Sequence, residues 1–171
     1  MPSAADLAAL LAGLPAEQRT ALINANLSGF DRVVGLQFEH VGDETISATL
    51  EIEASHLQPY GLVHGGVYAS LVESLCSVGA ALRELPRGNN VVGLENTTRF
   101  LRGTRVGAKL RAEASMTESP ADGRARWDAT ITDQAGEVCA TGRLIVAILA
   151  PDAAVGGEAV VLPNVSVPEN D

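Results

Sequence analysis

Apolar residues alternate with polar residues in several separate segments of this chain, and this alternation predicts strands. A period of two residues is typical of a strand that buries one face, especially where turn residues bound the segment. The predicted strands cover residues 33–41, 46–54, 91–101, 106–116, 125–131 and 138–148. Because each strand buries only one of its faces, we expect an antiparallel sheet with one face covered.

Turn signals separate these strands. Asp122-Gly123 is a strong β-hairpin signal, because both residue types tolerate a positive φ. The string from Asp133 to Gly136 predicts a second hairpin, and residues 42–44 predict a turn between the first two strands. The last three strands are therefore expected to be joined by tight turns.

One segment, from Gly65 to Glu84, departs from this pattern. It contains no Pro, and its large apolar residues recur at helical spacing. They form a single stripe: Val67, Leu71, Leu75, Val78 and Leu82. The other faces carry mainly Ala, Ser, Cys and Gly, and a helix that is apolar or small nearly all round is a buried one. We expect an α+β fold, in which an antiparallel sheet of five or six strands wraps around this one long central helix.

The segments before and after this pattern divide the chain. Residues 1–28 predict short amphipathic helices, an N-terminal extension that packs on the domain or extends a ligand pocket. Residues 29–149 make up the predicted domain. Residues 150–171 contain three Pro, two Gly and no Lys or Arg, which predicts an extended C-terminal tail.

The central helix carries one carboxylate in its middle, Glu73. This residue lies about 200° around the helix from Leu71 and therefore points away from the apolar stripe. Its face otherwise carries small residues, which leave room for another backbone or a ligand: Ala69, Ser70, Cys76, Ser77 and Ala80. Because burial of a lone ionised carboxylate is costly, such a group usually has a partner or a task. The alternative is a solvated Glu at the edge of the helix.

Composition narrows the classes of function. The chain has 171 residues, of which 46% are hydrophobic, enough for one domain with a real core. Its net charge of −9 argues against a nucleic-acid function, which needs a basic surface. Five of its twelve basic residues nevertheless crowd into thirteen positions: Arg99, Arg102, Arg105, Lys109 and Arg111. Such a cluster is either a strand edge protected by charge or a patch for an anionic ligand, and both interpretations stay open.

Three further observations concern location and cofactors. The longest apolar runs are too short to span a bilayer and the N-terminus lacks the basic start of a secretory signal, so we expect a cytoplasmic protein with no membrane partner. Cys76 and Cys139 are far apart in apolar settings, and we expect both to be reduced core residues. The three His, at positions 40, 56 and 64, show no metal-ligand spacing, so we expect no metal or other cofactor.

The string Leu62-Val63-His64-Gly65-Gly66 stands at the start of the predicted helix, and Glu73 follows eight residues after Gly65. Together with two strands before the helix, this combination resembles the hotdog-fold acyl-CoA thioesterases. Within them it is similar to the branch of phenylacetyl-CoA and 4-hydroxybenzoyl-CoA thioesterases, which place the catalytic Glu on the central helix. The resemblance covers about residues 30–149. Residues 96–102 also resemble the next strand of that family, although Gly103 stands where a Pro is common.

The resemblance implies catalytic roles by position. Glu73 is implied as the carboxylate that attacks the thioester or activates water. The amide of Gly65 is implied as the donor to the thioester oxygen, and Gln58 as a polar residue beside the thioester. His64 is implied to hold the loop or to contact the acyl group, and Ser77 to orient Glu73 or a water. The alternatives are a purely structural His64, a packing role for Ser77 and an exposed loop position for Gln58.

The resemblance also implies contacts with the substrate and its CoA. Asn96 and Thr98 lie in the strand that resembles the family's, and Arg102 matches a basic position near the CoA mouth. The alternative for Arg102 is a charged residue on a surface strand. The acyl group stays open between an aryl group and a medium-length aliphatic chain. Two rival functions are a hotdog acyl-CoA dehydratase or hydratase and a non-catalytic acyl-CoA-binding protein.

Elementary chemistry supports the implied mechanism. Attack on a thioester turns its carbonyl into an oxyanion, which the free amides and positive dipole of a helix N-terminus stabilise. A buried carboxylate suits a base that works near neutral pH. Gly65 and Glu73 are, however, about 12 Å apart along one helix, so one carbonyl cannot easily touch both. We therefore predict an obligate homodimer in which two antiparallel helices form two composite sites, and we expect these dimers to pair into a dimer of dimers.

Overall fold

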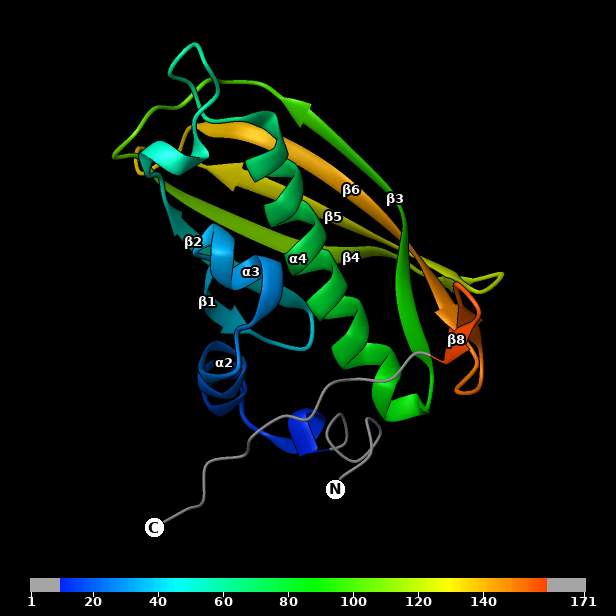
Figure 1. Ribbon diagram of the computed structural model, residues 1–171. Coiled ribbons are helices and arrows are strands. Elements are labelled where there is room, and N and C mark those ends of the chain that lie inside the picture. The colour runs from blue at the N-terminus through cyan, green and yellow to red at the C-terminus, as the bar shows by residue number, and fades with distance from the viewer. Residues whose placement is uncertain (1–9, 160–171) are drawn as a thin grey trace.

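The computed structural model describes residues 10–159 of the chain. Its main feature is an antiparallel sheet that curls around one long helix, α4 (Figure 1). The helices are α2 (Ala16–Ala25), α3 (Gly29–Val34) and α4 (Gly65–Glu84), with 3-10 turns at Ala54–His56 and Leu85–Arg87. The strands of the sheet are β1 (Gln37–Val41), β2 (Thr45–Glu51), β3 (Asn90–Phe100), β4 (Lys109–Ala121), β5 (Arg124–Thr132) and β6 (Val138–Leu149). This arrangement confirms the predicted α+β fold with six strands around one helix.

The strands lie in the order β1-β2-β4-β5-β6-β3, and all neighbouring pairs are antiparallel. β3 therefore forms one edge of the sheet, although β4, β5 and β6 follow it in the sequence. The segment after β3 crosses the end of the sheet to reach β4 (Figure 1). This topology keeps β3 beside α4, which contacts β3 as well as the central strands.

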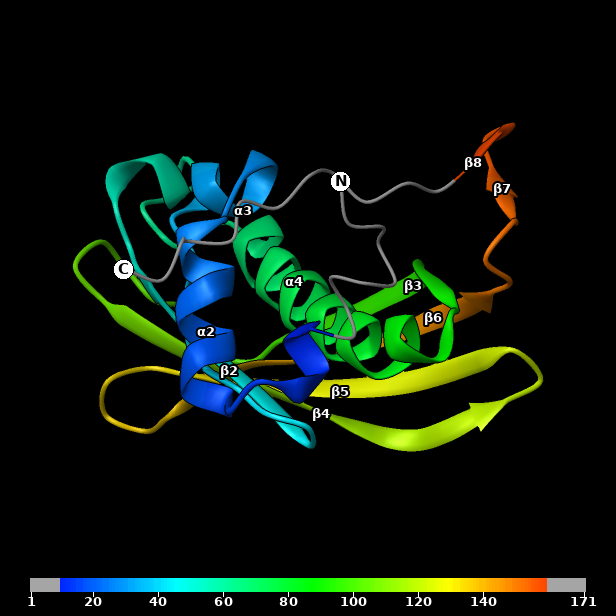
Figure 2. The ribbon, with the colours of Figure 1, turned by 90° about the horizontal axis from the view of Figure 1, so that it is seen from below.

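α4 lies across one face of the sheet, with α2 and α3 on the same side (Figure 2). The period-two pattern of β5 places Trp127 and Ile131 in the core beneath this helix. Gly79 of α4 lies directly over Trp127, and a Cβ atom at this position would overlap the indole ring. The apolar faces of the strands and the helix therefore form one continuous core, as the sequence pattern predicts.

More of α4 is buried than the apolar stripe predicts. Leu71 and Leu75 are fully buried, but Cys76 and Ala80, which we expected on the face of Glu73, are buried as well. Burial of Cys76 agrees with its predicted place in the core, whereas Ala80 is covered where room for a ligand was expected, because the sheet curls around the helix and covers more than one of its faces.

Both predicted hairpins are confirmed. At the β4–β5 turn, Asp122 has a φ of 51° and Gly123 a φ of 71°, the left-handed conformation that the dipeptide predicts. At the β5–β6 turn, an oxygen of Asp133 accepts hydrogen bonds from the amides of Ala135 and Glu137 at 2.9 and 3.0 Å. These local contacts fix the register of the three consecutive strands.

The first predicted strand begins later than expected. The pattern placed a strand over residues 33–41, but β1 starts at Gln37, because residues 29–34 form α3. Gly35 ends this helix with a φ of 82°. A left-handed residue directly after a helix is a common C-cap and favours glycine, so Gly35 forces the chain to turn before β1.

The C-terminal segment also differs from the prediction. Residues 150–159 were expected to be extended, but they contain a small hairpin of two-residue strands, β7 (Ala154–Val155) and β8 (Glu158–Ala159). Gly156 and Gly157 form its turn with φ values of 65° and 88°. The remainder of the predicted tail, 160–171, and residues 1–9 of the N-terminal extension lie outside the described residues.

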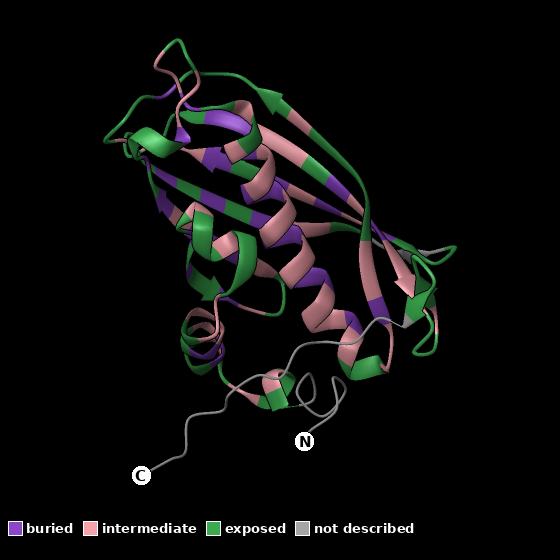
Figure 3. Cartoon of the chain, in the orientation of Figure 1, coloured by how far each residue is buried: buried purple, intermediate pink, exposed green. Residues whose placement is uncertain are grey.

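The two edges of the described sheet differ. At β1, the Asn24 side chain of α2 donates to the Phe38 carbonyl (2.8 Å) and accepts from the Phe38 amide (2.9 Å), and Thr20 Oγ1 accepts from the Val41 amide (2.9 Å). These side chains occupy the backbone groups of an edge strand and so protect it from further pairing. At β3, residues 93–97 are all exposed (Figure 3). α2 therefore closes one edge of the sheet, and β3 is the open one.

Among the described residues, one helical segment, Gly65–Arg87, is long and apolar enough to cross a membrane by length and composition alone, with a mean hydropathy of 1.3. The sequence predicts no such segment, because no single apolar run is long. Small residues between the leucines keep the average high. The segment contains α4, whose leucines pack against the sheet, so a place in the core of the fold accounts for its hydropathy.

Candidate active site

Glu73 lies in the middle of α4, is half-buried, and has its carboxylate next to β3. From β3, Asn96 donates through Nδ2 to Glu73 Oε2 at 3.0 Å and to the carbonyl of Ala69 at 3.0 Å. Thr98 in turn donates from Oγ1 to Asn96 Oδ1 at 2.8 Å. A chain of hydrogen bonds therefore runs from Thr98 through Asn96 to one oxygen of the Glu73 carboxylate.

The other carboxylate oxygen lies against a glycine of β3. A Cβ atom added to Gly93 would stand 2.5 Å from Glu73 Oε1. The pairing of β3 with β6 also shifts register between Gly93 and Glu95, which marks an irregularity of the β-bulge kind. Because a close approach of backbone to a side chain needs a residue without a Cβ atom, Gly93 shapes the Glu73 site.

Glu73 opens into a hollow of about 520 Å³ between α3, α4 and β3. The hollow is lined by Phe30 and Asp31 from α3, Asn96 from β3, and Ala69, Ser70, Glu73, Ser74, Ser77 and Val78 from α4. The structure thus brings three of the predicted site residues, Glu73, Ser77 and Asn96, to one place. Ser77 lies one helical turn after Glu73 on the wall of the hollow, as its predicted role requires.

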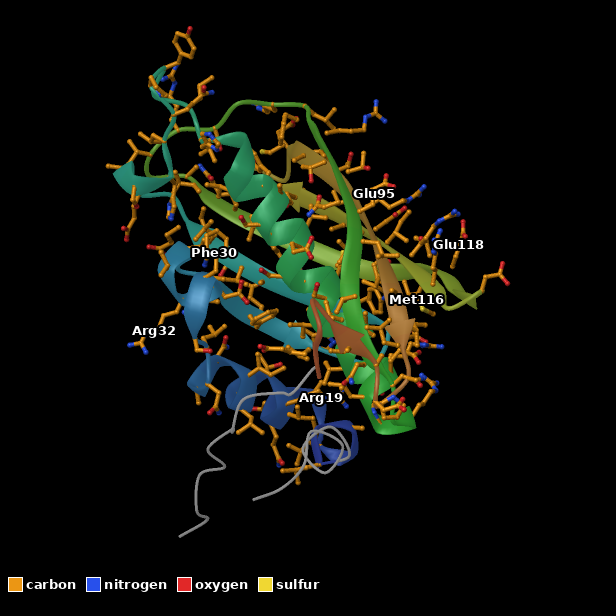
Figure 4. All side chains as sticks on the ribbon, turned by 45° about the vertical axis from the view of Figure 1, so that its right-hand side comes forward. Arg19, Phe30, Arg32, Glu95, Met116 and Glu118 are labelled. Atoms are coloured by element: carbon orange, nitrogen blue, oxygen red, sulfur yellow. The ribbon has the colours of Figure 1, made fainter. Side chains whose placement is uncertain are left out.

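The sequence pattern does not reveal the contribution of α3. Phe30 projects from α3 at the hollow with 63% of its surface exposed (Figure 4), and Asp31 accepts a hydrogen bond from Ser74 Oγ at 2.5 Å. The N-terminal extension that was expected to pack on the domain or to extend a ligand pocket ends at residue 28, so α3 lies outside it. A helix of six residues is too short for helical periodicity to reveal it, so these two residues carried no signal of their own.

The loop before α4 and the first turn of α4 form a second group. His64 is the N-cap of α4, and its Nδ1 accepts from the Gly66 amide at 2.9 Å. The next amide, of Val67, donates to the His64 carbonyl at 2.9 Å. Within the described part of the chain, the Gly65 amide donates to no acceptor, so it is available to a ligand.

This geometry gives His64 a structural role, which was one of the two open interpretations. Its ring stabilises the helix start, and because Nδ1 is the acceptor, the ring proton is on Nε2. The His64 amide also donates to the carbonyl of His56 at 2.8 Å, which fixes the approach to the helix. His64 therefore presents the Gly65 amide rather than lining the Glu73 hollow.

Phe100 covers the first turn of α4. A Cβ atom on Gly65 would stand 2.8 Å from Phe100 Cζ, so a glycine is needed for this contact. The ring is 60% exposed and lies 6.1 Å, centre to centre, from the ring of Tyr68. Tyr68 is itself buried and hydrogen-bonded to Thr104 Oγ1 at 2.7 Å, and its burial raises the pKa of the phenol. Phe100 thus supplies an apolar wall beside the free amide of Gly65.

Gln58 lies in the loop before α4, where its backbone forms a turn. Its amide donates to the Leu62 carbonyl at 2.8 Å, and its carbonyl accepts from the Gly61 amide at 2.9 Å. Its side chain is half-buried and is absent from the lining of the Glu73 hollow. Within one chain, the predicted catalytic residues therefore fall into two groups, one at the start of α4 and one in its middle, about 12 Å apart.

The basic cluster does not form a single patch. Arg102 pairs with Glu137 at 2.9 Å, whereas Arg111 pairs with Glu39 and Glu113 at 3.1 and 2.9 Å. Arg102 follows the edge strand β3, but Arg111 is on β4, and β5 and β6 lie between these two strands. The cluster is thus divided between two parts of the sheet, and Arg105 lies at the loop before α4, where its Nη1 donates to the Gly61 carbonyl at 3.3 Å.

The cysteines are free and buried, as predicted. Burial, followed by the charges of Glu73 and Asp128, raises the pKa of the Cys76 thiol to about 12. Burial also raises the pKa of Cys139. Since the thiolate is the nucleophilic form of cysteine, Cys76 stays protonated and inert although it lies close to Glu73. Cys76 is therefore not a competing nucleophile beside the Glu73 carboxylate.

Comparisons with known proteins find relatives of this fold. A family model described as "Thioesterase superfamily" matches residues 60–140. The 1,4-dihydroxy-2-naphthoyl-CoA hydrolase of Escherichia coli is 34% identical over 134 residues, which cover 78% of this chain and 93% of that protein. The proofreading thioesterase EntH of Cronobacter sakazakii is 32% identical over 116 residues, 68% of this chain and 82% of that protein. The crystal structure of a thioesterase from Haemophilus influenzae has a TM-score of 0.69 at 26% identity and covers 81% of this chain and 92% of that chain.

Proposed function

Because the chain belongs to the thioesterase superfamily, with its hotdog fold, and is therefore a thioester hydrolase, we propose that its substrate is an acyl-CoA with an aryl or medium-chain acyl group. The products are the free acid and CoA. The observation that carries the proposal is the Glu73 carboxylate, held by Asn96 at the floor of an open hollow. The Escherichia coli relative is named for an aryl-CoA, which favours an aryl group.

Glu73 can act by two routes. As a nucleophile, it attacks the thioester carbon; the C–S bond breaks, the CoA thiolate leaves with the electron pair, and water then hydrolyses the acyl–Glu73 anhydride. As a general base, it takes a proton from the water that attacks the same carbon. Both routes need a carboxylate oxygen without a hydrogen bond, and Glu73 Oε1 accepts none from the described residues. Ser77, one turn away, is proposed to hold the water or to orient Glu73.

We assign Asn96 and Thr98 to the positioning of Glu73. Asn96 donates to the carboxylate and to the carbonyl of Ala69, so it ties the side chain of Glu73 to its own helix. Thr98 fixes the amide of Asn96 in the orientation that donates to Glu73. Holding a nucleophile or base within a few tenths of an ångström of its productive position contributes a large part of the rate acceleration.

The oxyanion donor is proposed to come from a second copy of the chain. The Gly65 amide is free, but in its own chain it lies about 12 Å along the helix from Glu73. If two chains pair through the open β3 edge, their α4 helices run antiparallel, and Gly65 of the partner subunit lies beside Glu73. Leu94 and Phe100, which are 53% and 60% exposed on this edge, supply apolar surface for such a dimer. Gln58, at the same end of α4 as Gly65, belongs to the same half of the proposed site.

The CoA phosphates are proposed to meet Arg102. Its ion pair with Glu137 has both side chains more than half exposed, at 52% and 59%. Exposed pairs of this kind are weak, so a phosphate can displace Glu137 from the guanidinium. The proposed location is the cytoplasm, which is supported by two free cysteines, since thiols persist in reducing compartments.

The test is free-thiol release from benzoyl-, phenylacetyl-, hexanoyl- and palmitoyl-CoA, with the wild type beside Glu73→Gln and Glu73→Ala. The Gln variant keeps the shape of the side chain and its hydrogen bond from Asn96 but removes the reactive carboxylate. We expect the wild type to release CoA and both variants to lose at least about a thousandfold of kcat. Unchanged turnover in a folded Glu73→Gln variant would refute the assignment of Glu73.

A further inference from the structure

One buried histidine takes no part in the proposed chemistry. His56 is 8% exposed and ends the 3-10 turn Ala54–His56, between β2 and the loop that leads to α4. The described lining of the Glu73 hollow does not include it. Because a polar ring is costly to bury unless its nitrogens are hydrogen-bonded, the contacts of this ring indicate what it does.

Both ring nitrogens of His56 are engaged. Nδ1 accepts from the amide of Glu53 at 3.0 Å, and Nε2 lies 2.9 Å from the carbonyl oxygen of Val34, the last residue of α3. Since Nδ1 is the acceptor, the ring proton is on Nε2 and is donated to Val34. The ring is therefore neutral, and it joins the 3-10 turn to the C-terminal end of α3.

α3 depends on polar contacts for its position. None of its six residues is buried, so apolar burial contributes little to its docking. The Val34 carbonyl stands at the helix end, where carbonyls lack partners within the helix, and the His56 ring satisfies it. Ser74 of α4 donates to Asp31 of α3 at 2.5 Å. Because residues of α3 line the Glu73 hollow, His56 helps to fix one wall of that hollow.

The backbone of His56 reaches the start of α4. Its carbonyl accepts from the amide of His64, the N-cap of α4, at 2.8 Å. An antiparallel bridge between the first and last residues of the loop 57–63 is adjacent to this bond and closes the base of the loop. Gln58 is in this loop, and Gly65 follows the N-cap directly. His56 therefore contacts the elements that carry both halves of the proposed site.

We propose that His56 is a positioning residue of this thioesterase, whose ring holds α3 and the approach to α4 in one arrangement. The inference rests on the proposed function, because it takes Glu73 and Gly65 as parts of the site. The bond to Val34 sets the wall of the Glu73 hollow and therefore the affinity for the substrate. The bond from the Glu53 amide sets the 3-10 turn, and with it the loop and the Gly65 amide that is offered to the oxyanion.

Two variants separate the two bonds of the ring. In His56→Asn, the side-chain oxygen takes the place of Nδ1 and can accept from the Glu53 amide, but the shorter side chain does not reach Val34. In His56→Gln, the terminal amide takes the place of Nε2 and can donate to Val34, but the contact with the Glu53 amide is lost. Steady-state kinetics on the acyl-CoA that the wild type hydrolyses fastest measure both.

The two variants are expected to change different constants. We expect His56→Asn to raise KM about three- to tenfold with kcat within about twofold of the wild type, because the wall of the hollow is released. We expect His56→Gln to lower kcat about three- to tenfold with KM within about twofold, because the Gly65 amide loses its fixed position. Each variant loses one hydrogen bond, so their losses of Tm are expected to be similar.

His40→Asn is the matched control, since His40 is an exposed histidine of β1. Both of its constants are expected to equal those of the wild type. Two outcomes would overturn the inference. One is wild-type kcat and KM in both His56 variants, because the ring would then only fill space. The other is an equal change of both constants in both variants, which a purely structural role would produce.

If the wild type hydrolyses none of the acyl-CoAs, the proposed function fails instead, and hydrogen exchange then tests His56 without hydrolysis. The amides of His64 and Gly66 are both hydrogen-bonded at the start of α4. We expect them to exchange faster in His56→Gln than in His56→Asn, because only the Gln variant releases the 3-10 turn. Equal exchange in the two variants would exclude the positioning role.

Discussion

At the scale of single residues, the contacts of Asn96 predict that it positions Glu73 and does not bind the substrate. Asn96 donates to Glu73 and to the carbonyl of Ala69, both at 3.0 Å. We expect Asn96→Ala to lower kcat about ten- to a hundredfold and to leave KM within about twofold, because Glu73 loses its orientation while the substrate contacts persist. Thr98→Val, which acts only through Asn96, is expected to cause a smaller loss. Steady-state kinetics on the best acyl-CoA substrate measure both.

Thr97→Ala is the matched control for these variants. Thr97 is on the same strand, but its hydroxyl donates to Glu95 at 2.9 Å and has no contact with Glu73. Its removal is expected to leave kcat unchanged. A rise in KM at constant kcat for Asn96→Ala would instead place Asn96 in direct contact with the substrate or its CoA, the role that the family resemblance implies.

Gly93 brings the backbone of β3 close to the Glu73 carboxylate. In Gly93→Ala, the new methyl group would stand 2.5 Å from Glu73 Oε1. Because Gly93 is exposed, we expect this variant to lose most of its activity while its Tm stays within a few degrees of the wild type. Gly79→Ala is a control with the opposite expectation, a lower Tm. Its Cβ would overlap Trp127 in the core, and overpacking costs about 1–3 kcal/mol. Equal losses of Tm in both variants would refute this distinction.

The sequence alone identifies part of this site. Gly65 and Glu73 stand in one short segment, and the physics of a helix start and of a carboxylate in the middle of an apolar helix predicts their chemistry. The roles of Asn96 and Gly93 could not be predicted in this way. Each depends on where β3 crosses α4, which is a contact between residues about twenty positions apart, set by the order of strands in the sheet.

At the scale of elements, the start of α4 decides whether the Gly65 amide points outward. His64 caps the helix through its ring, and loss of an N-cap typically costs about 1 kcal/mol. We expect His64→Ala to lower the free energy of unfolding by about this amount. Asn is a good N-cap, so we expect the His64→Asn variant to have both the stability and the activity of the wild type. Urea unfolding and kcat measurements check the two variants, and a stable but inactive His64→Asn would show that the imidazole itself takes part in the reaction.

The elements that the sequence predicts well are those with a long or local signal. α4 has twenty residues of helical pattern, and each hairpin is coded by its own turn residues. α3 has six residues, and its length is set by Gly35, whose left-handed φ of 82° ends the helix. The apparent strand pattern from Val33 onward therefore belongs partly to a helix, because valine fits either structure when only two or three residues are considered.

At the scale of the whole molecule, the sheet has one protected edge and one open edge. α2 occupies the backbone groups of β1, and the exposed run of residues 93–97 lies on β3. The alternation of apolar and polar residues predicts the strands but not which of them lies at an edge of the sheet. The difference between the two edges is therefore seen only in the fold. It supports a dimer that pairs through β3, and such a dimer would join the two halves of the predicted site.

The composite site makes a sharp prediction for mixed dimers. In Gly65→Pro, the oxyanion amide is lost while the helix start is preserved, because Pro is well tolerated at the first helical position and His64 before it is already extended. The ring of Phe100 has to shift to admit the new Cβ, and the exposed position of Phe100 allows this. Gly65→Pro and Glu73→Gln are each expected to be inactive alone.

When the two variants are co-expressed in equal amounts, half of the dimers contain one copy of each. A site shared between subunits then receives an intact Glu73 from one chain and an intact Gly65 from the other, in one of the two sites of each mixed dimer. Activity is therefore expected to return to about a quarter of the wild-type value, measured as free-thiol release per dimer. If Glu73 and Gly65 act within the same chain, each chain of the mixed dimer still lacks one of them, and no activity returns.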